Sequence, residues 1–303
     1  MAKSPESLGG LHERANVLAA GLPPLMVAAD RVAATVSQGV HGRRRVGQGE
    51  TFWQFRRYHQ GDTMQKIDWR RSAKSDLVYV RETEWEAAQS VWLWSDASPS
   101  MRFRSSRGLP EKVERADLLS LALASLLVRG GEQVAYLGAN MRPSHGRMAL
   151  NLVAAAMEER DTDPDSDESM AGSLPPYEPV PRHGRLVLIS DFLEPLSEIN
   201  KIIGIFADRG VGGHLLQVLD PAEESLPFKG RTRFEGMERE GTALIGKVEG
   251  IRRQYGDEMA GHRHDLRSLA QAAGWSLGLH VTDQPPEQAL LGLYVALAGP
   301  EAY

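Results

Sequence analysis

The chain contains no cysteine, and this absence removes disulfides, thiolate metal sites and cysteine nucleophiles from consideration. It also has no apolar run that approaches the roughly 20 residues of a membrane-spanning helix. The first residues, M-A-K-S-P-E-S-L-G-G, carry no apolar core of signal-peptide length. We therefore expect a cytoplasmic protein without a membrane span.

Two catalytic signatures are missing as well. The phosphate-binding loop G-x-x-x-x-G-K-[ST] does not occur, and neither does the nucleophile motif G-x-S-x-G. Hydrophobic residues at 42% and charged residues at 25% are typical of a globular protein with a sizeable core. A length of 303 residues fits about two domains, or one large α/β domain with an extension.

From residue 84 onward, segments typical of strands alternate with segments typical of helices. This alternation predicts an α/β fold, with a mostly parallel sheet covered by helices on both faces. The expected strands are 88–94, 133–137, 186–190, 214–218 and 275–281, and the expected helices are 114–129, 148–158, 196–209, a long helix ending at 273, and 286–298. We also expect a hairpin near 232–248.

The rest of the chain predicts two further parts. Residues 1–40 form an N-terminal helical segment, with helical spacing of apolar residues between Leu8 and Val36. Residues 41–83 form a basic, aromatic segment packed on the main domain, which spans 84–303. Between Arg43 and Arg81, ten basic residues and four acids give a net charge of +6, although the whole chain carries −5. The remainder of the chain therefore carries −11.

Polar residues follow the first strand of the main domain in an alternating pattern. The sequence S-D-A-S-P-S-M places Asp96, Ser98 and Ser100 at the strand's carboxyl end, and Asp191 follows the later strand V-L-I-S in the same way. Ligands of parallel sheets bind at this edge, near the switch in strand order. Carboxylate and hydroxyl oxygens suit Mg²⁺, so these four residues are candidate metal ligands. The alternative is that the two aspartates cap turns.

The segment before this strand resembles a known family signature. Residues 47–82, G-Q-G-E-T-F-W-Q-F-R-R-Y-H-Q-G-D-T-M-Q-K-I-D-W-R-R-S-A-K-S-D-L-V-Y-V-R-E, are similar to domain-of-unknown-function family 58. Lysine stands at Lys66 and Lys74, where that family usually has arginine, and the spacing around Glu50 differs. The D-x-S-x-S motif with a second aspartate resembles the metal-ion-dependent adhesion site of von Willebrand factor A-like domains.

The resemblance implies a von Willebrand factor A-like fold and a partnership with a MoxR-type AAA+ ATPase that acts on an unknown client protein. In the sites it resembles, the two serines bind the ion directly and the aspartates bind directly or through water. A carboxylate from the partner can complete the shell. Such sites usually add a threonine, for which the only candidates here are Ser144 and Thr162.

The basic segment admits three interpretations. Its arginines and aromatics can bind nucleic acid, or its aromatics can anchor it on the sheet domain while its arginines pair with acids elsewhere. The third is a docking surface for an acidic partner such as the ATPase. Asp62 and Asp68 would repel phosphate, so we favour the structural interpretation over nucleic acid. The candidate partner-binding residues are Arg56, Arg57, Asp62, Asp68, Trp69, Arg70 and Arg71.

Two further patterns are weaker and have simpler explanations. Residues 161–168, D-T-D-P-D-S-D-E, imitate the start of a calcium loop but lack its glycine and its final glutamate, so we expect an acidic linker. His262 and His264 lie two apart on an expected helix, where they cannot share a metal, and we expect them on its solvated surface.

The sequence thus predicts a non-enzymatic protein-interaction module, an adaptor or effector of the ATPase that binds partners through Mg²⁺. Two alternatives stay open. One is the nucleic-acid binder described above. The other is a metal-dependent phosphohydrolase with Asp96 as nucleophile or ligand, although such enzymes usually carry a second aspartate where this chain has Ser98.

Overall fold

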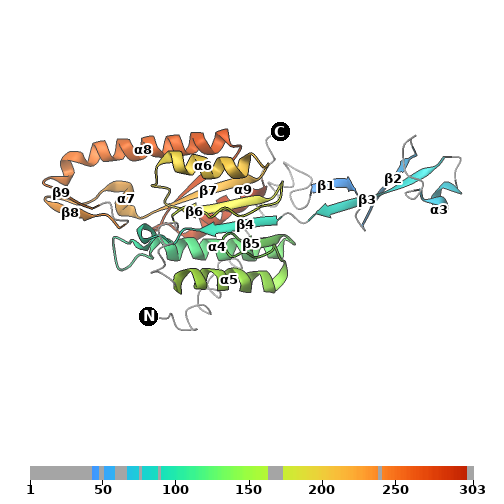
Figure 1. Cartoon of the computed structure of the whole chain (residues 1–303), viewed down its shortest axis with the longest axis horizontal. Helices are drawn as coiled ribbons and strands as arrows, with labels where there is room; N and C mark the ends of the chain where they lie inside the picture. The colour runs from blue at the N-terminus through green and yellow to red at the C-terminus, as the bar shows by residue number, and fades with distance from the viewer. Residues whose placement is uncertain are drawn as a thin grey trace.

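The computed structural model of the chain describes residues 43–47, 51–58, 67–74, 77–87, 90–162, 173–237 and 241–298. The expected N-terminal helical segment and most of the expected acidic linker lie outside these ranges. Within them the structure contains a five-stranded sheet with helices on both faces, a three-stranded sheet and a two-stranded hairpin (Figure 1).

All neighbouring strands of the five-stranded sheet run parallel. The sheet comprises β4 (Ser90–Ser95), β5 (Gln133–Tyr136), β6 (Arg185–Ser190), β7 (Gly212–Leu219) and β10 (Ser276–Val281), in the order β10-β7-β6-β4-β5. The chain leaves β4 toward β5 and then returns to place β6 on the other side of β4. The switch in strand order therefore lies between β4 and β6, where doubly wound folds bind their ligands.

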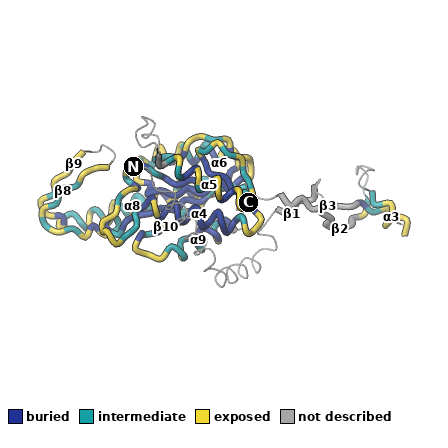
Figure 2. The backbone as a smooth tube through the Cα atoms, turned by 90° about the horizontal axis from the view of Figure 1, so that it is seen from below, coloured by how far each residue is buried: buried dark blue, intermediate teal, exposed yellow. Residues whose placement is uncertain are grey.

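Helices cover both faces of this sheet. Helices α4 (Lys112–Arg129), α5 (Gly146–Thr162) and α9 (Pro286–Ala298) pack on one face, and α6 (Leu196–Ala207) and α8 (Val248–Ala272) pack on the other. A hydrophobic core lies on each face of the sheet, and alternate residues of β4 contribute to one core or the other. Val91 and Leu93 face α4, whereas Trp92 and Trp94 face α6 and α8. Burial on both faces explains the continuous apolar runs of the strands (Figure 2).

The α/β prediction is confirmed, including the mostly parallel sheet and the helices on both faces, and the topology is consistent with a von Willebrand factor A-like fold. Each expected strand and helix of the main domain is present. The expected hairpin is also present, as β8 (Thr232–Glu235) and β9 (Thr242–Ile245). The sequence did not indicate two short elements at the carboxyl edge of the sheet, the 3-10 helix η2 (Pro99–Arg102) and α7 (Pro221–Ser225).

The basic segment forms more strand than its sequence suggested. β1 (Arg43–Gly47), β2 (Thr51–Arg57) and β3 (Tyr79–Ala87) make an antiparallel sheet in the order β1-β3-β2, and α3 (Trp69–Ser72) lies between β2 and β3 in the chain. Figure 1 shows this sheet to the side of the main sheet rather than against either of its faces. The division at 83/84 falls within β3, and the domain boundaries stay predictions.

Among the described helices, none combines the length and the apolar character that crossing a membrane requires.

Candidate metal centre

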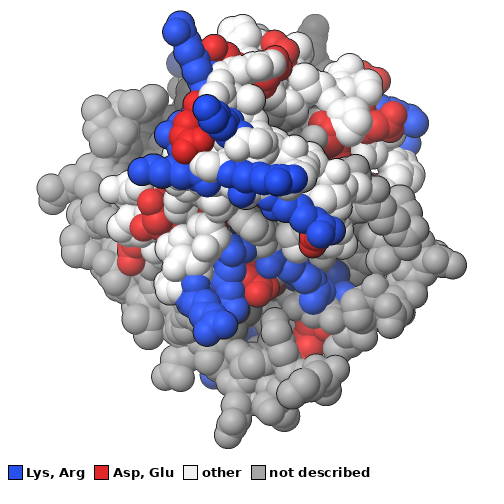
Figure 3. Space-filling model, turned by 90° about the vertical axis from the view of Figure 1, so that its left-hand side faces the viewer, with Lys and Arg blue, Asp and Glu red and all other residues white. Residues whose placement is uncertain are grey.

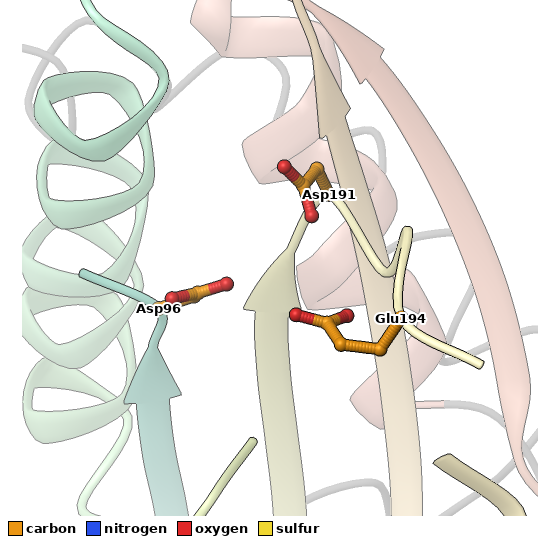
Figure 4. A group of neighbouring side chains, drawn as sticks. All are labelled: Asp96, Asp191 and Glu194. Atoms are coloured by element: carbon orange, nitrogen blue, oxygen red, sulfur yellow. The ribbon is translucent and has the colours of Figure 1, made fainter. Parts of the chain in front are cut away.

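Asp96 and Asp191 lie directly after β4 and β6, at the carboxyl edge of the sheet and on the two sides of the switch in strand order. The backbone amide of Asp96 donates to the carbonyl of Ile189 at 2.9 Å, which brings the two strand ends into register. Figure 4 shows both carboxylates directed toward one space, together with the carboxylate of Glu194. One carboxylate oxygen from each of the three residues lies within 4.8 Å of the others.

Asp96 is fully buried and both of its carboxylate oxygens accept hydrogen bonds. The backbone amide of Ser98 donates to Oδ1 at 2.7 Å, and the hydroxyl of Ser190 donates to Oδ2 at 2.7 Å. Burial, together with the nearby charge of Asp191, raises the pKa of Asp96 from 3.8 to about 6 in spite of these bonds. The ionised side chain is therefore held in place at an electrostatic cost that a cation would relieve.

The two predicted serines are brought to Asp191. The hydroxyls of Ser98 and Ser100 lie 3.1 Å apart, and the hydroxyl of Ser100 donates to Oδ2 of Asp191 at 2.9 Å. All four predicted metal ligands thus meet at one place. Their roles as ligands stay predictions, because in this arrangement the hydroxyl of Ser100 serves Asp191 directly.

A lysine that sequence reasoning missed lies beside these carboxylates. Lys112, the first residue of α4, is completely buried, and its ammonium donates to Oδ2 of Asp191 at 2.8 Å and to Oε1 of Glu223 at 2.6 Å. Burial by itself lowers the pKa of Lys112, but the two carboxylates outweigh that effect and the pKa is raised. A lysine at the first position of a helix is usually exposed, so its local sequence carried no signal of this role.

Glu194 is the other residue that the sequence analysis overlooked. Its Oε2 atom is buried without a hydrogen-bond partner among the described residues. Burial raises the pKa of Glu194 to about 7, and the charges of Asp191 and Asp96 act in the same direction. The available signal was weak: a glutamate three residues after the aspartate in S-D-F-L-E.

The backbone that carries Asp191 and Glu194 is strained at one residue between them. Phe192 has a φ of 51°, in the left-handed region that non-glycine residues seldom adopt. Its amide donates to the hydroxyl of Ser190 at 3.1 Å, its ring is buried, and Nε2 of His262 donates to its carbonyl at 2.6 Å. Strain held by such surrounding bonds is a recurrent property of functional loops.

The oxygen donors fit a hard divalent cation. Ser100 and Lys112 together use both lone pairs of Oδ2 of Asp191, whereas among the described residues Oδ1 accepts only a long bond of 3.3 Å from the amide of Leu193. Oδ1 of Asp191, the carboxylate of Asp96 and the orphaned oxygen of Glu194 are therefore the atoms best able to hold the ion. All are carboxylate oxygens, the ligand type that Mg²⁺ prefers.

A second polar network lies immediately beside this cluster, on the other side of β4. The hydroxyl of Ser95 donates to Oδ1 of Asp117 at 2.8 Å and lies 2.8 Å from the hydroxyl of Tyr136. The guanidinium of Arg160 donates to the carbonyl of Ser95 and pairs with Oδ2 of Asp117, both at 2.9 Å. Arg160 can reach this edge because an antiparallel bridge between Val134 and Ser144 turns the chain back before α5 begins.

The predicted partner-binding residues that the structure describes lie in β2 and in α3 with its cap. Asp68 caps α3 by accepting from the amide of Arg71 at 2.8 Å, and Arg70 and Arg71 are exposed. Trp69 is 65% exposed, so the expectation that aromatics of this segment anchor it on the main domain is wrong for Trp69. Arg57 is exposed at the end of β2, whereas Asp62 and the side chain of Arg56 lie outside the described residues.

The remaining sequence candidates have local roles where they are described. Ser144 pairs with Val134 through its backbone, and its hydroxyl donates to the carbonyl of Arg142 at 3.1 Å. His264 is exposed as expected, but His262 is half-buried and donates to the Phe192 carbonyl, so its placement on a solvated surface was wrong. The side chain of Thr162 and residues 163–172 lie outside the described part of the chain.

Comparison with known proteins identifies a family but no activity. The profile of the family described as "Protein of unknown function DUF58" matches residues 54–265. "Uncharacterized protein Rv1480" of Mycobacterium tuberculosis and "Uncharacterized protein Mb1516" of Mycobacterium bovis are each 26% identical over 265 residues, which cover 85% of this chain and 82% of the relative.

Two of the solved structures that resemble this chain come from Bacteroides species. A crystal structure of the conserved hypothetical protein BatB from Bacteroides thetaiotaomicron is 16% identical, with a TM-score of 0.36. An aerotolerance-related membrane protein from Bacteroides fragilis, with multiple mutations to serines, is 18% identical, with a TM-score of 0.37. Each match covers 69% of this chain and 98% of the other. With such low scores, the fold assignment rests on the sheet topology of this chain.

Proposed function

Since the chain belongs to the DUF58 family, whose function is unknown, we propose its role from its own geometry: a non-enzymatic protein-interaction module of the cytoplasm. Its carboxyl-edge site, formed by Asp96, Asp191 and Glu194, holds Mg²⁺ or a similar divalent cation. A carboxylate of the partner completes the coordination, so that the ion joins the two proteins. Ser98 and Ser100 orient the aspartates or add further oxygens to the shell.

One observation carries the metal proposal. One carboxylate oxygen from each of the three residues lies within 4.8 Å of the others, and Oε2 of Glu194 is buried without a hydrogen-bond partner in the described structure. Buried carboxylates of a purely structural cluster are normally satisfied by donors, because an unpaired buried polar atom is costly. A carboxylate of such a cluster that keeps one buried oxygen without a donor is better explained as a metal ligand.

The metal can be tested by calorimetric titration of Mg²⁺ and Mn²⁺. We expect binding to the wild type and its loss in Asp96→Asn and Glu194→Gln, which keep the side-chain volume but remove charge. Glu198→Gln is the matched control, because Glu198 lies one turn further along on the exposed surface of α6. Equal binding by Glu194→Gln and Glu198→Gln would refute the metal site.

The partner that the family resemblance suggests is a MoxR-type AAA+ ATPase acting on an unknown client. With purified ATPase in the absence of nucleotide, we expect association in Mg²⁺, its loss in EDTA, and its loss in Asp96→Asn. Association that is unchanged by EDTA and by Asp96→Asn would exclude the metal-mediated contact. The ATPase would then have to dock elsewhere on the chain.

The geometry supports the two alternative functions, phosphohydrolase and nucleic-acid binder, less well than the interaction module. Asp96 is fully buried, so a phosphate ester could reach its carboxylate only if the residues that cover it moved. In the basic segment, the exposed Trp69 adjoins Asp68, whose charge opposes phosphate. Neither observation favours a phosphohydrolase or a nucleic-acid binder over the interaction module.

A further inference from the structure

The face that surrounds the candidate metal centre carries an unexpected concentration of basic side chains. Three segments far apart in the sequence contribute them: 102–109, 227–233 and 247–253. Together these segments contain nine basic residues and one acid, Glu249. Eight of the basic side chains are exposed, and we call this set the basic rim: Arg102, Arg104, Arg107, Lys229, Arg231, Arg233, Lys247 and Arg253.

Hydrogen bonds join the first segment to α7 and the second segment to the third. The amide of Ser105 donates to the carboxylate of Asp220, which caps α7, at 2.9 Å. The amide of Gly230 donates to Glu249 at 2.9 Å, which joins the second segment to the start of α8. Glu223 of α7 binds Lys112, whose ammonium also binds Asp191, so α7, whose cap holds the first segment, is linked to the candidate metal centre through Lys112.

Figure 3 views this side of the molecule and shows Lys and Arg side chains spread across the face, with carboxylates between them. Within the described part of the chain, Arg104 pairs loosely with Glu111 at 3.9 Å and Arg233 pairs with Glu235 at 2.8 Å. No such ion pair involves Arg102, Arg107 or Arg231 among the described residues. Their charge is therefore directed at solvent or at a partner.

We propose that the basic rim docks an acidic, leucine-containing segment of a partner protein across the mouth of the carboxyl-edge site. The proposal rests on the chain being a protein-interaction module, but it does not require the metal. Opposite charges attract such a segment, and exposed apolar side chains give it something to pack against. Leu193, Met237 and Leu244 are 43%, 43% and 57% exposed.

A protein segment fits this face better than nucleic acid. Binding of single strands uses exposed aromatic rings on which bases stack, and the described rim offers none. Phe228 and Phe234 are engaged with each other, edge to face, with ring centroids 5.6 Å apart. Arginine and methionine are instead enriched at protein interfaces.

The test is fluorescence anisotropy with three labelled probes: a peptide of glutamate and leucine, the same peptide with glutamine in place of glutamate, and single-stranded DNA. We expect the acidic peptide to bind most tightly, with an affinity that falls as salt rises. The triple variant Arg102→Glu, Arg107→Glu and Arg231→Glu should weaken its binding at least about ten-fold.

The matched control reverses the charge at three exposed arginines distant from the rim, with the substitutions Arg129→Glu, Arg182→Glu and Arg267→Glu. It changes the net charge equally and should alter peptide affinity less than about two-fold. Equal losses in the two triple variants, or tighter binding of DNA than of the acidic peptide, would overturn the proposal.

Repeating the titration in Mg²⁺ and in EDTA, on the wild type and Asp96→Asn, separates this inference from the proposed metal site. Binding that depends on the rim but not on Mg²⁺ supports the rim and removes the metal-mediated contact. Binding that depends on Mg²⁺ but is unchanged in the rim variant supports the metal-mediated contact and overturns the basic rim as the docking surface.

Discussion

Ser95 and Asp96 are adjacent at the end of β4, yet they enter two networks of opposite character. Ser95 joins Asp117, Tyr136 and Arg160, in which a carboxylate is matched by a guanidinium and the hydroxyls serve one another. Asp96 faces Asp191 and Glu194, where the pKa of Asp96 is raised to about 6 by burial and by Asp191. The balanced network is what stability alone requires, whereas the unbalanced one is the feature from which we propose a metal site.

The largest expected effect breaks the balanced network. Asp117→Ala leaves the partly buried guanidinium of Arg160 without its carboxylate, and we expect the free energy of unfolding to fall by about 3–5 kcal/mol. Denaturant titration measures this loss. Glu198→Ala, which removes an exposed pair with Lys201 at 4.0 Å, is the control and should cost less than about 0.5 kcal/mol. A loss as small for Asp117→Ala would show that the Ser95 network is not structural.

The buried residue His214 adds a third case to the comparison of the two networks, because it is titratable but has no charged partner among the described residues. Burial lowers the pKa of His214 from 6.5 to about 4, and Nδ1 lies 2.7 Å from the hydroxyl of Ser276. The neutral ring is favoured in the folded state, so its contribution is present above pH 6.5 and is lost as the pH falls toward 4.

The expected size of this loss is about 3 kcal/mol, from a pKa shift of roughly two to three units. In His214→Gln, the part of the stability loss at low pH that His214 causes should disappear. Denaturant titrations at pH 7 and near pH 4 would detect this difference. Parallel pH profiles for the wild type and His214→Gln would show that His214 is not the group responsible.

Lys112 links the unbalanced cluster to α7 and supplies the only cation that the described structure places against Asp191. In Lys112→Met, the carboxylates of Asp191 and Glu223 lose their counter-charge, and we expect stability without metal to fall by about 2–4 kcal/mol. Removing a positive charge at 2.8 Å from Asp191 should also raise Mg²⁺ affinity at least about ten-fold. Calorimetry checks the affinity, and a decrease would mean that Lys112 organises the site instead of competing with the ion.

The smallest expected effect concerns the serine between the two aspartates. Ser100→Ala removes a single donor to Asp191, so Mg²⁺ affinity should change by about 1 kcal/mol, or roughly five-fold. A loss of binding as complete as that of Asp96→Asn would instead identify the Ser100 hydroxyl as a direct ligand. The outcome decides between the role suggested by the resemblance and the hydrogen bond seen in the structure.

Much of the main domain was predictable because its signals are local. The apolar runs of β4, β6 and β7 are buried on both faces, and the helix that begins at Pro286 ends as expected at Ala298. Asp96 and Asp191 were found because each follows a strand, and parallel strands end at the same edge. The strands β1 and β2 were missed because their basic sequences, R-R-R-V-G and T-F-W-Q-F-R-R, lack the alternation that marks a half-buried strand.

The sequence by itself determined the α/β class, the positions of the main-domain strands along the chain and the two aspartates at strand ends. These features follow from periodicity and from residue type. Only the tertiary structure decided that Lys112 is buried against Asp191 and Glu223, that Glu194 completes the carboxylate cluster, and that three distant segments form the basic rim. The reason is physical. Whether a charged side chain is exposed or buried, and which charge it meets, depends on how helices and loops pack around the sheet edge, and short stretches of sequence do not encode that packing.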